Sequence, residues 1–269
     1  MRASCIAALN LVLVGLATPQ LRTPEPLEGV GIEEKIGQKV DLGLEFVAEN
    51  GYPVRLAQFF GKGRPVILNL IYYSCPTLCN LILNGQTDAL REIPGVPGKD
   101  FEILTVSIDP AETFDLARRK RAAYLESYGR PAPGWHFLTD YRGNVRKLAE
   151  QVGFHYRYDE RTRQYAHASA IMILTPEGAV ARYLYGVRFK PRDLRLALAE
   201  AASSRGGFSV DRMLLFCYRY DPQMRSYVLF ATNFMRAGAA ASTLLLAVVL
   251  IRLWRREARA AREAREKVA

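Results

Sequence analysis

The sequence predicts an α/β domain, with a central mixed sheet flanked by helices, followed by one membrane-spanning helix near the C-terminus. Three observations support this prediction. Apolar runs rich in β-branched residues alternate with segments whose apolar residues recur at helical spacing, which is typical of layered α/β domains. A turn signal between two further apolar runs indicates a hairpin. An uncharged apolar run at residues 237–251 is followed by a strongly basic tail, as in membrane anchors.

The individual elements follow from the local pattern. The run Arg64–Ser74 is apolar and β-rich, as expected of a central strand that is buried on both faces. Cys75-Pro76 ends it, and helical spacing then extends over Thr77–Ile93. The turn Pro176-Glu177-Gly178 joins the two strands of the hairpin. The other expected elements are strands at Phe101–Ile108, Trp135–Leu138, Ala168–Leu174 and Val180–Leu184 and helices at Glu112–Tyr128, Asn144–Val152 and Arg192–Ala201.

This order of elements, with a cysteine pair at the first strand-to-helix turn, is that of a thioredoxin-like domain. We place the domain at residues 41–202. Residues 18–40 are rich in Pro, Gly and charge, which indicates a linker. Residues 203–235 have no strong periodicity and are expected to connect the domain to the membrane helix.

The composition excludes some classes of protein. With 49% hydrophobic and 24% charged residues, the chain is too apolar for a disordered protein and can bury a core. A net charge of +10 raises the question of nucleic-acid binding. However, residues 252–269 hold seven Arg or Lys against three Glu beside the apolar run. The membrane therefore explains this charge, and we expect no nucleic-acid partner.

The N-terminus has the layout of a secretory signal peptide at residues 1–17. One Arg precedes an apolar run from Cys5 to Ala17, and polar, Pro-rich sequence follows. The run is short for a spanning helix, although an uncleaved anchor is the alternative. Cleavage near Ala17 would remove Cys5 and leave three cysteines.

The C-terminal anchor is expected at residues 236–254, with a basic tail at 255–269. Arg236 and Arg252 can snorkel from its two ends. By the positive-inside rule the tail faces the cytoplasm. We therefore expect a bacterial-type inner-membrane protein with a single C-terminal span, whose main domain lies on the extracytoplasmic, periplasmic side. A buried helix of a soluble protein is the alternative.

The central motif is Cys75-Pro76-Thr77-Leu78-Cys79. If a helix begins within it, residues four apart lie on nearly the same face, with Cβ atoms about 5–6 Å apart. A helix N-terminus favours thiolates, and soft thiolates select copper(I) over hard cations. A redox-active thioredoxin normally has CxxC, so the extra residue favours metal binding. Two structural cysteines or a plain disulfide remain the alternative.

The chain has three histidines. His167 directly precedes the strand Ala168–Leu174, and in a thioredoxin-like sheet the loop that enters this strand lies beside the cysteine turn. His167 is therefore the best candidate for a third metal ligand, although a lone histidine is usually only a polar loop residue. An imidazole would let the site hold Cu(II) as well as Cu(I). We expect His136 and His155 to be structural.

A family resemblance supports this interpretation. The segments IYYSCPTLC, SIDP, WHFLTD and HASAIMILTPEG resemble the Sco/SenC copper chaperones in order and spacing, over roughly residues 35–202. The resemblance implies that Cys75, Cys79 and His167 bind one copper ion per chain. It also places Asp109 near the metal, where it would orient or tune the ligands. A helix-cap or turn role is the alternative for Asp109.

The resemblance implies a metallochaperone rather than an enzyme. Its function would be to deliver copper to the binuclear copper centre of cytochrome c oxidase subunit II, or to keep the thiols of that centre reduced. Another periplasmic copper chaperone is a possible further partner. The alternatives are a membrane-anchored thiol–disulfide oxidoreductase or peroxidase-like enzyme on the same fold, and a binding scaffold with an inert disulfide.

Two features depart from the family pattern. Many members have an N-terminal anchor, whereas this chain is expected to use a C-terminal one. Cys217 is left unpaired once Cys75 and Cys79 are assigned, so it is either an accessory copper ligand or mixed-disulfide partner, or a small buried apolar residue. Nearby aromatic residues are expected at the outer membrane interface: Tyr218, Tyr220, Tyr227, Phe230 and Phe234.

Overall fold

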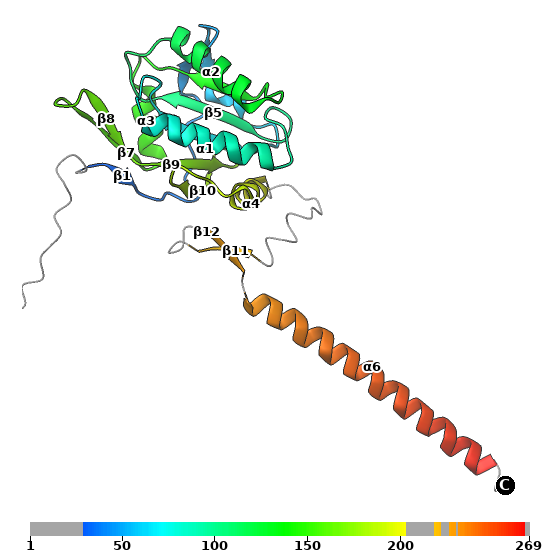
Figure 1. Cartoon of the computed structure of the whole chain (residues 1–269). Coiled ribbons are helices and arrows are strands. Elements are labelled where there is room, and N and C mark those ends of the chain that lie inside the picture. The colour runs from blue at the N-terminus through cyan, green and yellow to red at the C-terminus, as the bar shows by residue number, and fades with distance from the viewer. Residues whose placement is uncertain (1–28, 203–217, 222–225, 230, 267–269) are drawn as a thin grey trace, which may run out of the picture.

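A five-stranded mixed sheet forms the centre of the domain in the computed structural model (Figure 1). The structure describes residues 29–202, 218–221, 226–229 and 231–266. The strand order is β10-β9-β4-β5-β6; β4, β5 and β6 are parallel, whereas β9 runs antiparallel to both β4 and β10. The strands are β4 (Val66–Ile71), β5 (Glu102–Ser107), β6 (Trp135–Leu138), β9 (Ala170–Leu174) and β10 (Val180–Tyr185).

Helices cover this sheet. The crossovers β4-α1-β5 and β5-α2-β6 step in the same direction, so the right-handed rule puts α1 and α2 on one face. The helix α4 packs against both α1 and β10, and α3 packs against β7. All six residues of β4 and of β5 are buried, which explains why both strands are apolar along their length. The helices are α1 (Leu78–Glu92), α2 (Phe114–Tyr128), α3 (Asn144–Gln151) and α4 (Pro191–Ala202).

A second, smaller sheet had not been expected. The hairpin of β7 (Phe154–Asp159) and β8 (Gln164–His167) pairs with β1 (Gly31–Ile32) in the order β1-β7-β8. Its residues are largely polar and partly exposed, so no buried-strand signal marks them. Part of the segment expected to be a linker therefore lies against the domain through β1. Further short elements are β2 (Glu45–Val47), β3 (Pro53–Arg55) and the 3₁₀ helix η2 (Leu56–Phe59).

The structure confirms the expected α/β architecture and shortens the first central strand. The expected strand Arg64–Ser74 is shorter, because β4 ends at Ile71 and the chain bends before the cysteine motif. In the segment expected to be a connection, β11 (Tyr218–Asp221) and β12 (Ser226–Leu229) form a hairpin. The signal peptide expected at residues 1–17 and Cys217 lie outside the described residues.

The helix α6 (Ala231–Glu266) carries the C-terminal apolar run (Figure 1). Its segment Gly238–Arg255 is long and apolar enough to cross a bilayer, and none of this segment is buried within the protein. A core helix of a soluble protein would be mostly buried, so its exposure fits the expected membrane anchor better. The helix continues to Glu266 without a break, into the basic tail.

Candidate metal centre

The cysteine motif lies at the carboxyl end of the central strand β4. The helix α1 begins at Leu78, with Thr77 as its N-cap. Cys79 is therefore in the first turn of α1, whereas Cys75 lies in the bend before the helix. The sequence predicted both cysteines on one face of a helix. Only Cys79 lies in the helix, whereas the bend brings Cys75 back toward the helix start.

The two cysteines and His167 lie next to one another. The backbone N–H of Cys79 donates to Cys75 Sγ at 3.4 Å. Cys79 Sγ is 3.2 Å from His167 Nε2. His167 is the last residue of β8, and the antiparallel neighbour β9 of the central strand starts three residues later. Residues 88 positions apart in the sequence thus meet because β9 pairs with β4.

The imidazole of His167 is oriented by the backbone. Its Nδ1 lies 2.9 Å from the carbonyl oxygen of Ala168. A carbonyl can only accept, so Nδ1 carries the proton in this contact. The lone pair of Nε2 then faces Cys79 Sγ, and this arrangement is the one that metal-binding histidines commonly have.

The protein environment shifts the pKa values of the two thiols in opposite directions. Burial alone would raise the pKa of Cys75, but hydrogen bonds to its sulfur from the Cys79 backbone and the Tyr72 hydroxyl outweigh burial and lower that pKa. Burial raises the pKa of Cys79 far above its ordinary value, and the nearby Cys75 adds to the shift. Burial also lowers the pKa of His167, so the imidazole is neutral at pH 7. Cys75 is the more readily ionised thiol of the pair.

Aromatic rings surround the three side chains. The ring centroid of His167 lies 6.1 Å from that of Tyr72, in an edge-to-face arrangement, and 5.9 Å from that of Phe154. Tyr72 in turn packs edge-to-face on Tyr165, with centroids 5.5 Å apart. Only 6% of Cys75, 2% of Cys79 and 7% of His167 is exposed. The site is thus largely screened from water, with small openings at Cys75 and His167.

Asp109 reaches the site only indirectly. Its Oδ1 accepts the backbone N–H of Ala111 at 2.9 Å, which closes a local turn. Its carboxylate also bonds the hydroxyl of Tyr165, and burial together with this charge raises the pKa of Tyr165 to about 12. The link from Asp109 to His167 therefore passes through two tyrosine rings.

A carboxylate that sequence reasoning missed lies closer to the motif. Glu112 Oε2 accepts the backbone N–H of Tyr73 at 2.7 Å, and Glu112 Oε1 accepts that of Ser74 at 2.6 Å. The Ser107 hydroxyl donates to Glu112 Oε2 at 2.6 Å. The only signal in the sequence is that Glu112 follows the SIDP segment by two residues, which does not distinguish it from Asp109.

The other two histidines are remote from the cysteines. His136 is the second residue of the edge strand β6 and lies between two carboxylates, 3.7 Å from Glu49 and 3.9 Å from Glu102. His155 is exposed in β7 and lies 3.6 Å from Glu33. Each histidine therefore belongs to a local charge cluster.

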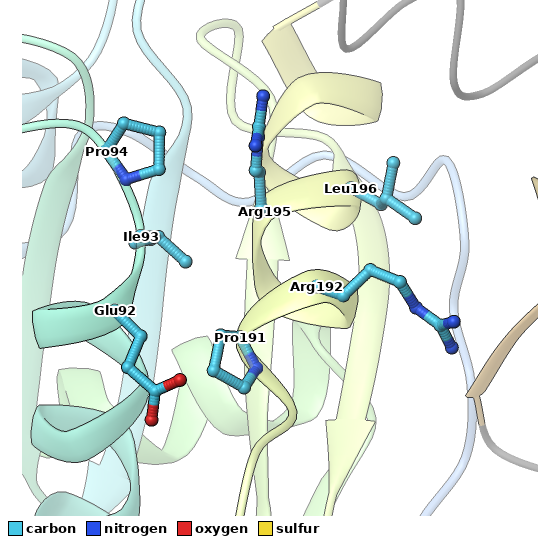
Figure 2. Close-up of a pocket in the computed structure, with 7 residues that line it drawn as sticks. All are labelled: Glu92, Ile93, Pro94, Pro191, Arg192, Arg195 and Leu196. Atoms are coloured by element: carbon cyan, nitrogen blue, oxygen red, sulfur yellow. The ribbon is translucent and has the colours of Figure 1, made fainter.

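A cavity of about 320 Å³ opens at the far end of α1, between that helix end and α4 (Figure 2). Because α1 has 15 residues, about 22 Å of helix separates this cavity from the cysteine motif. It is therefore not part of the thiol site. The cavity is lined by Glu92, Ile93, Pro94, Pro191, Arg192, Arg195 and Leu196.

The donor set fits a soft metal ion. In the described part of the chain, no three Cys, His, Asp or Glu side chains already surround a single point as ligands would, and both motif cysteines are free thiols. The two sulfurs and the imidazole nevertheless form a continuous chain of contacts. Two thiolates and one imidazole suit copper in either oxidation state.

Several solved structures are similar to this chain. Two structures from Aquifex aeolicus VF5, whose names suggest electron transfer and electron transport, are each 26% identical to this chain. The first covers 64% of this chain and 96% of its own, with a TM-score of 0.55, and the second covers 63% and 99%, with a TM-score of 0.52. Copper-bound ScoI from Arabidopsis thaliana is 19% identical over 61% of this chain and 100% of its own, with a TM-score of 0.47.

No curated protein matches the chain. A model of the SCO1/SenC family matches residues 34–202. This range contains the thioredoxin-like domain with Cys75, Cys79 and His167. The match extends over more than half of the 269 residues, and the chain therefore belongs to the SCO1/SenC family.

Proposed function

We propose that this protein binds one copper ion per chain through Cys75, Cys79 and His167, and delivers it to the binuclear copper site of cytochrome c oxidase subunit II. The observation that carries the proposal is the 3.2 Å contact between Cys79 Sγ and His167 Nε2, beside a second free thiol. Membership in a family with a copper-related role in cytochrome c oxidase assembly supports it.

The chemistry of the site suits a metal that must be taken up and released. Copper is here a cargo rather than a resident cofactor. Two sulfurs and one nitrogen leave room in the coordination shell for an incoming ligand, so transfer can proceed by ligand exchange. Burial of Cys79 at 2% exposure keeps hydrated hard cations away, and the more exposed Cys75 is where an incoming thiol would first attack.

A second function uses the same two thiols. Cys75 has the lowered pKa, which makes it the better nucleophile for attack on a disulfide. In that reaction the Cys75 thiolate would attack one sulfur of a substrate disulfide and release the other as a thiolate. Cys79 would then displace the second sulfur, so that the substrate is reduced and a Cys75–Cys79 disulfide forms. Keeping the thiols of the oxidase copper site reduced is this second candidate function.

The proposal includes a location. The apolar segment of α6 would anchor the chain, and the basic tail would lie in the cytoplasm. Residues 41–202 would then lie on the extracytoplasmic side of a bacterial-type inner membrane. Asp109 would act on the site indirectly. Its carboxylate would hold Tyr165 against Tyr72, and this packing would support the position of His167.

Copper titration of the reduced full-length chain in detergent tests the proposal. We expect one Cu(I) per chain, with binding lost in Cys75→Ser and Cys79→Ser and strongly weakened in His167→Ala. His155→Ala is the matched control, because this exposed imidazole lies away from the thiols, and it should bind as the wild type does. If all five proteins bind copper equally, or if none binds it while the thiols still exchange with disulfides, copper delivery by this site is wrong.

A further inference from the structure

Two hydrogen bonds of the Glu112 carboxylate end at the backbone directly before the cysteine motif. The side chain is only partly buried and precedes α2 in the loop after β5. Its two oxygens accept from two consecutive backbone N–H groups, those of Tyr73 and Ser74, at 2.7 and 2.6 Å. Ser107, the last residue of β5, orients the carboxylate through a third bond of 2.6 Å. None of these contacts belongs to the ligands of the proposed copper site.

The two backbone N–H groups bond to Glu112 rather than to a neighbouring strand. The strand β4 ends at Ile71, so Tyr73 and Ser74 are past the sheet and before α1. Hydrogen bonds to a charged acceptor are about twice as strong as neutral ones. The carboxylate of Glu112 therefore fixes the backbone of the bend immediately before Cys75. The buried phenol of Tyr73 adds to this, because its hydroxyl lies 2.8 Å from the Thr105 carbonyl and 2.7 Å from the Leu138 carbonyl.

A second side chain holds the bend from the helix side. Asn80 Nδ2 donates to the carbonyl oxygen of Cys75 at 3.1 Å. The Asn80 Oδ1 atom accepts from Lys120 Nζ of α2 at 2.9 Å. The carbonyl group of Cys75 and the backbone N–H groups of the two residues before it are thus tied to side chains. Most of this support comes from the β5–α2 region, which is remote from the motif in sequence.

We propose that Glu112 is a positioning residue for the dithiol, holding the bend in which Cys75 lies beside Cys79 and thereby setting how tightly the pair grips a copper ion or closes into a disulfide. The copper part of this inference rests on the function proposed above. The disulfide part does not, because both free thiols and their spacing are independent of any metal.

The main test compares Glu112→Gln with the wild type as full-length proteins in detergent. An amide of the same shape can accept one backbone N–H through its oxygen, but its NH₂ group faces the other donor. We expect the dissociation constant for Cu(I), measured by competition with a chromophoric Cu(I) chelator, to rise roughly 10–100-fold, as is typical when a group that supports metal ligands is removed. Asp115→Asn is the control, because this carboxylate is also near the start of α2 but pairs with exposed Arg118, and it should leave the constant unchanged.

The second readout needs no copper. In glutathione buffers, the reduced protein and glutathione disulfide yield the Cys75–Cys79 disulfide and two reduced glutathione molecules. One S–S bond forms as the other breaks, and the two thiol protons pass to glutathione. A looser bend lowers the equilibrium constant for closure, and each tenfold loss raises the reduction potential by about 30 mV. We expect such a rise in Glu112→Gln and no change in Asp115→Asn.

The outcomes separate the two proposals. If Glu112→Gln is folded and both its copper affinity and its potential stay within about twofold of the wild-type equilibria, the positioning role is wrong even when wild-type copper binding is confirmed. If the wild type binds no copper but the potential still shifts, the positioning role stands and the copper function fails. If Glu112→Gln does not fold, Ser107→Ala decides. It removes one bond to the carboxylate and should shift the potential in the same direction by a smaller amount, whereas an unchanged potential refutes the role.

Discussion

Gly85 offers a sharp test of how α1 is held in place. It lies in the middle of α1, on the buried side of the helix that carries Cys79 at its start. A Cβ atom at this position would lie 2.0 Å from the carbonyl oxygen of Val187 and 2.9 Å from its carbonyl carbon. These are backbone atoms of the segment between β10 and α4, so no side-chain rotation can relieve the contact. Gly85→Ala must therefore push the helix and this segment apart.

Two opposing contributions set the change in the free energy of unfolding that Gly85→Ala causes. Contacts below 3.0 Å essentially never occur, so the two backbones must separate by at least about 1 Å. Overpacking of a buried contact typically costs about 1–3 kcal/mol, and a backbone obstacle puts the cost near the upper end. Alanine recovers about 1 kcal/mol through its higher helix propensity. We expect a net loss of roughly 1–2 kcal/mol in the free energy of unfolding.

Urea unfolding of the full-length chain in detergent, followed by the fluorescence of buried Trp135, measures this loss. Asp88→Ala is the matched control, because it lies in the same helix but is exposed and makes only a surface ion pair with Arg91. It should change the stability by less than about 0.5 kcal/mol. If Gly85→Ala is as stable as the wild type or more stable, the close approach of α1 to Val187 is not the constraint that we describe.

Two further predictions concern the thiols and the bend before them. In the reduced protein, iodoacetamide should label Cys75 before Cys79, because hydrogen bonds lower the pKa of Cys75 and burial raises that of Cys79. The labelling rate of Cys75 should rise with pH to a midpoint below pH 9, whereas the midpoint for Cys79 should lie above pH 9. Peptide mass spectrometry separates the two sites, and a common midpoint would contradict the assignment. Tyr73→Phe should reduce the free energy of unfolding by about 1–3 kcal/mol, because the buried hydrogen bond from its hydroxyl to the backbone carbonyls is lost. Tyr141→Phe, at a side chain with 65% exposure, should have no effect in the same urea experiment.

The sequence pattern alone identified strands that are buried to the same degree along their whole length. The strands β4 and β5 are buried at every position, so an unbroken apolar run identifies them without knowledge of their neighbours. The same holds for the hairpin of β9 and β10, where a short turn joins two apolar runs. The hairpin of β7 and β8 was missed for the opposite reason, because its polar, partly exposed strands resemble a loop in composition.

The role of the Glu112 carboxylate could not be predicted from the sequence, for a different reason. Asp109 and Glu112 lie three residues apart, and the sequence offers no reason to prefer one. Asp109 closes its own turn and contacts Tyr165, whereas Glu112 reaches across to the backbone of the neighbouring strand end. The difference arises because β5 pairs in parallel with β4, which puts the loop after β5 beside the bend after β4. Hydrogen bonds between residues 39 positions apart cannot be inferred from spacing.

By itself, the sequence determined the alternation of strands and helices, the apolar C-terminal helix and the three candidate donor side chains, because hydrophobic periodicity and residue chemistry are local properties. Only the tertiary structure decided that His167 Nε2 faces Cys79, that Cys75 lies outside the helix, and that Glu112 holds the bend. These depend on which strands pair and on how deeply each group is buried. Strand pairing and burial arise only when distant segments pack together, and they also set the difference in pKa between the two thiols.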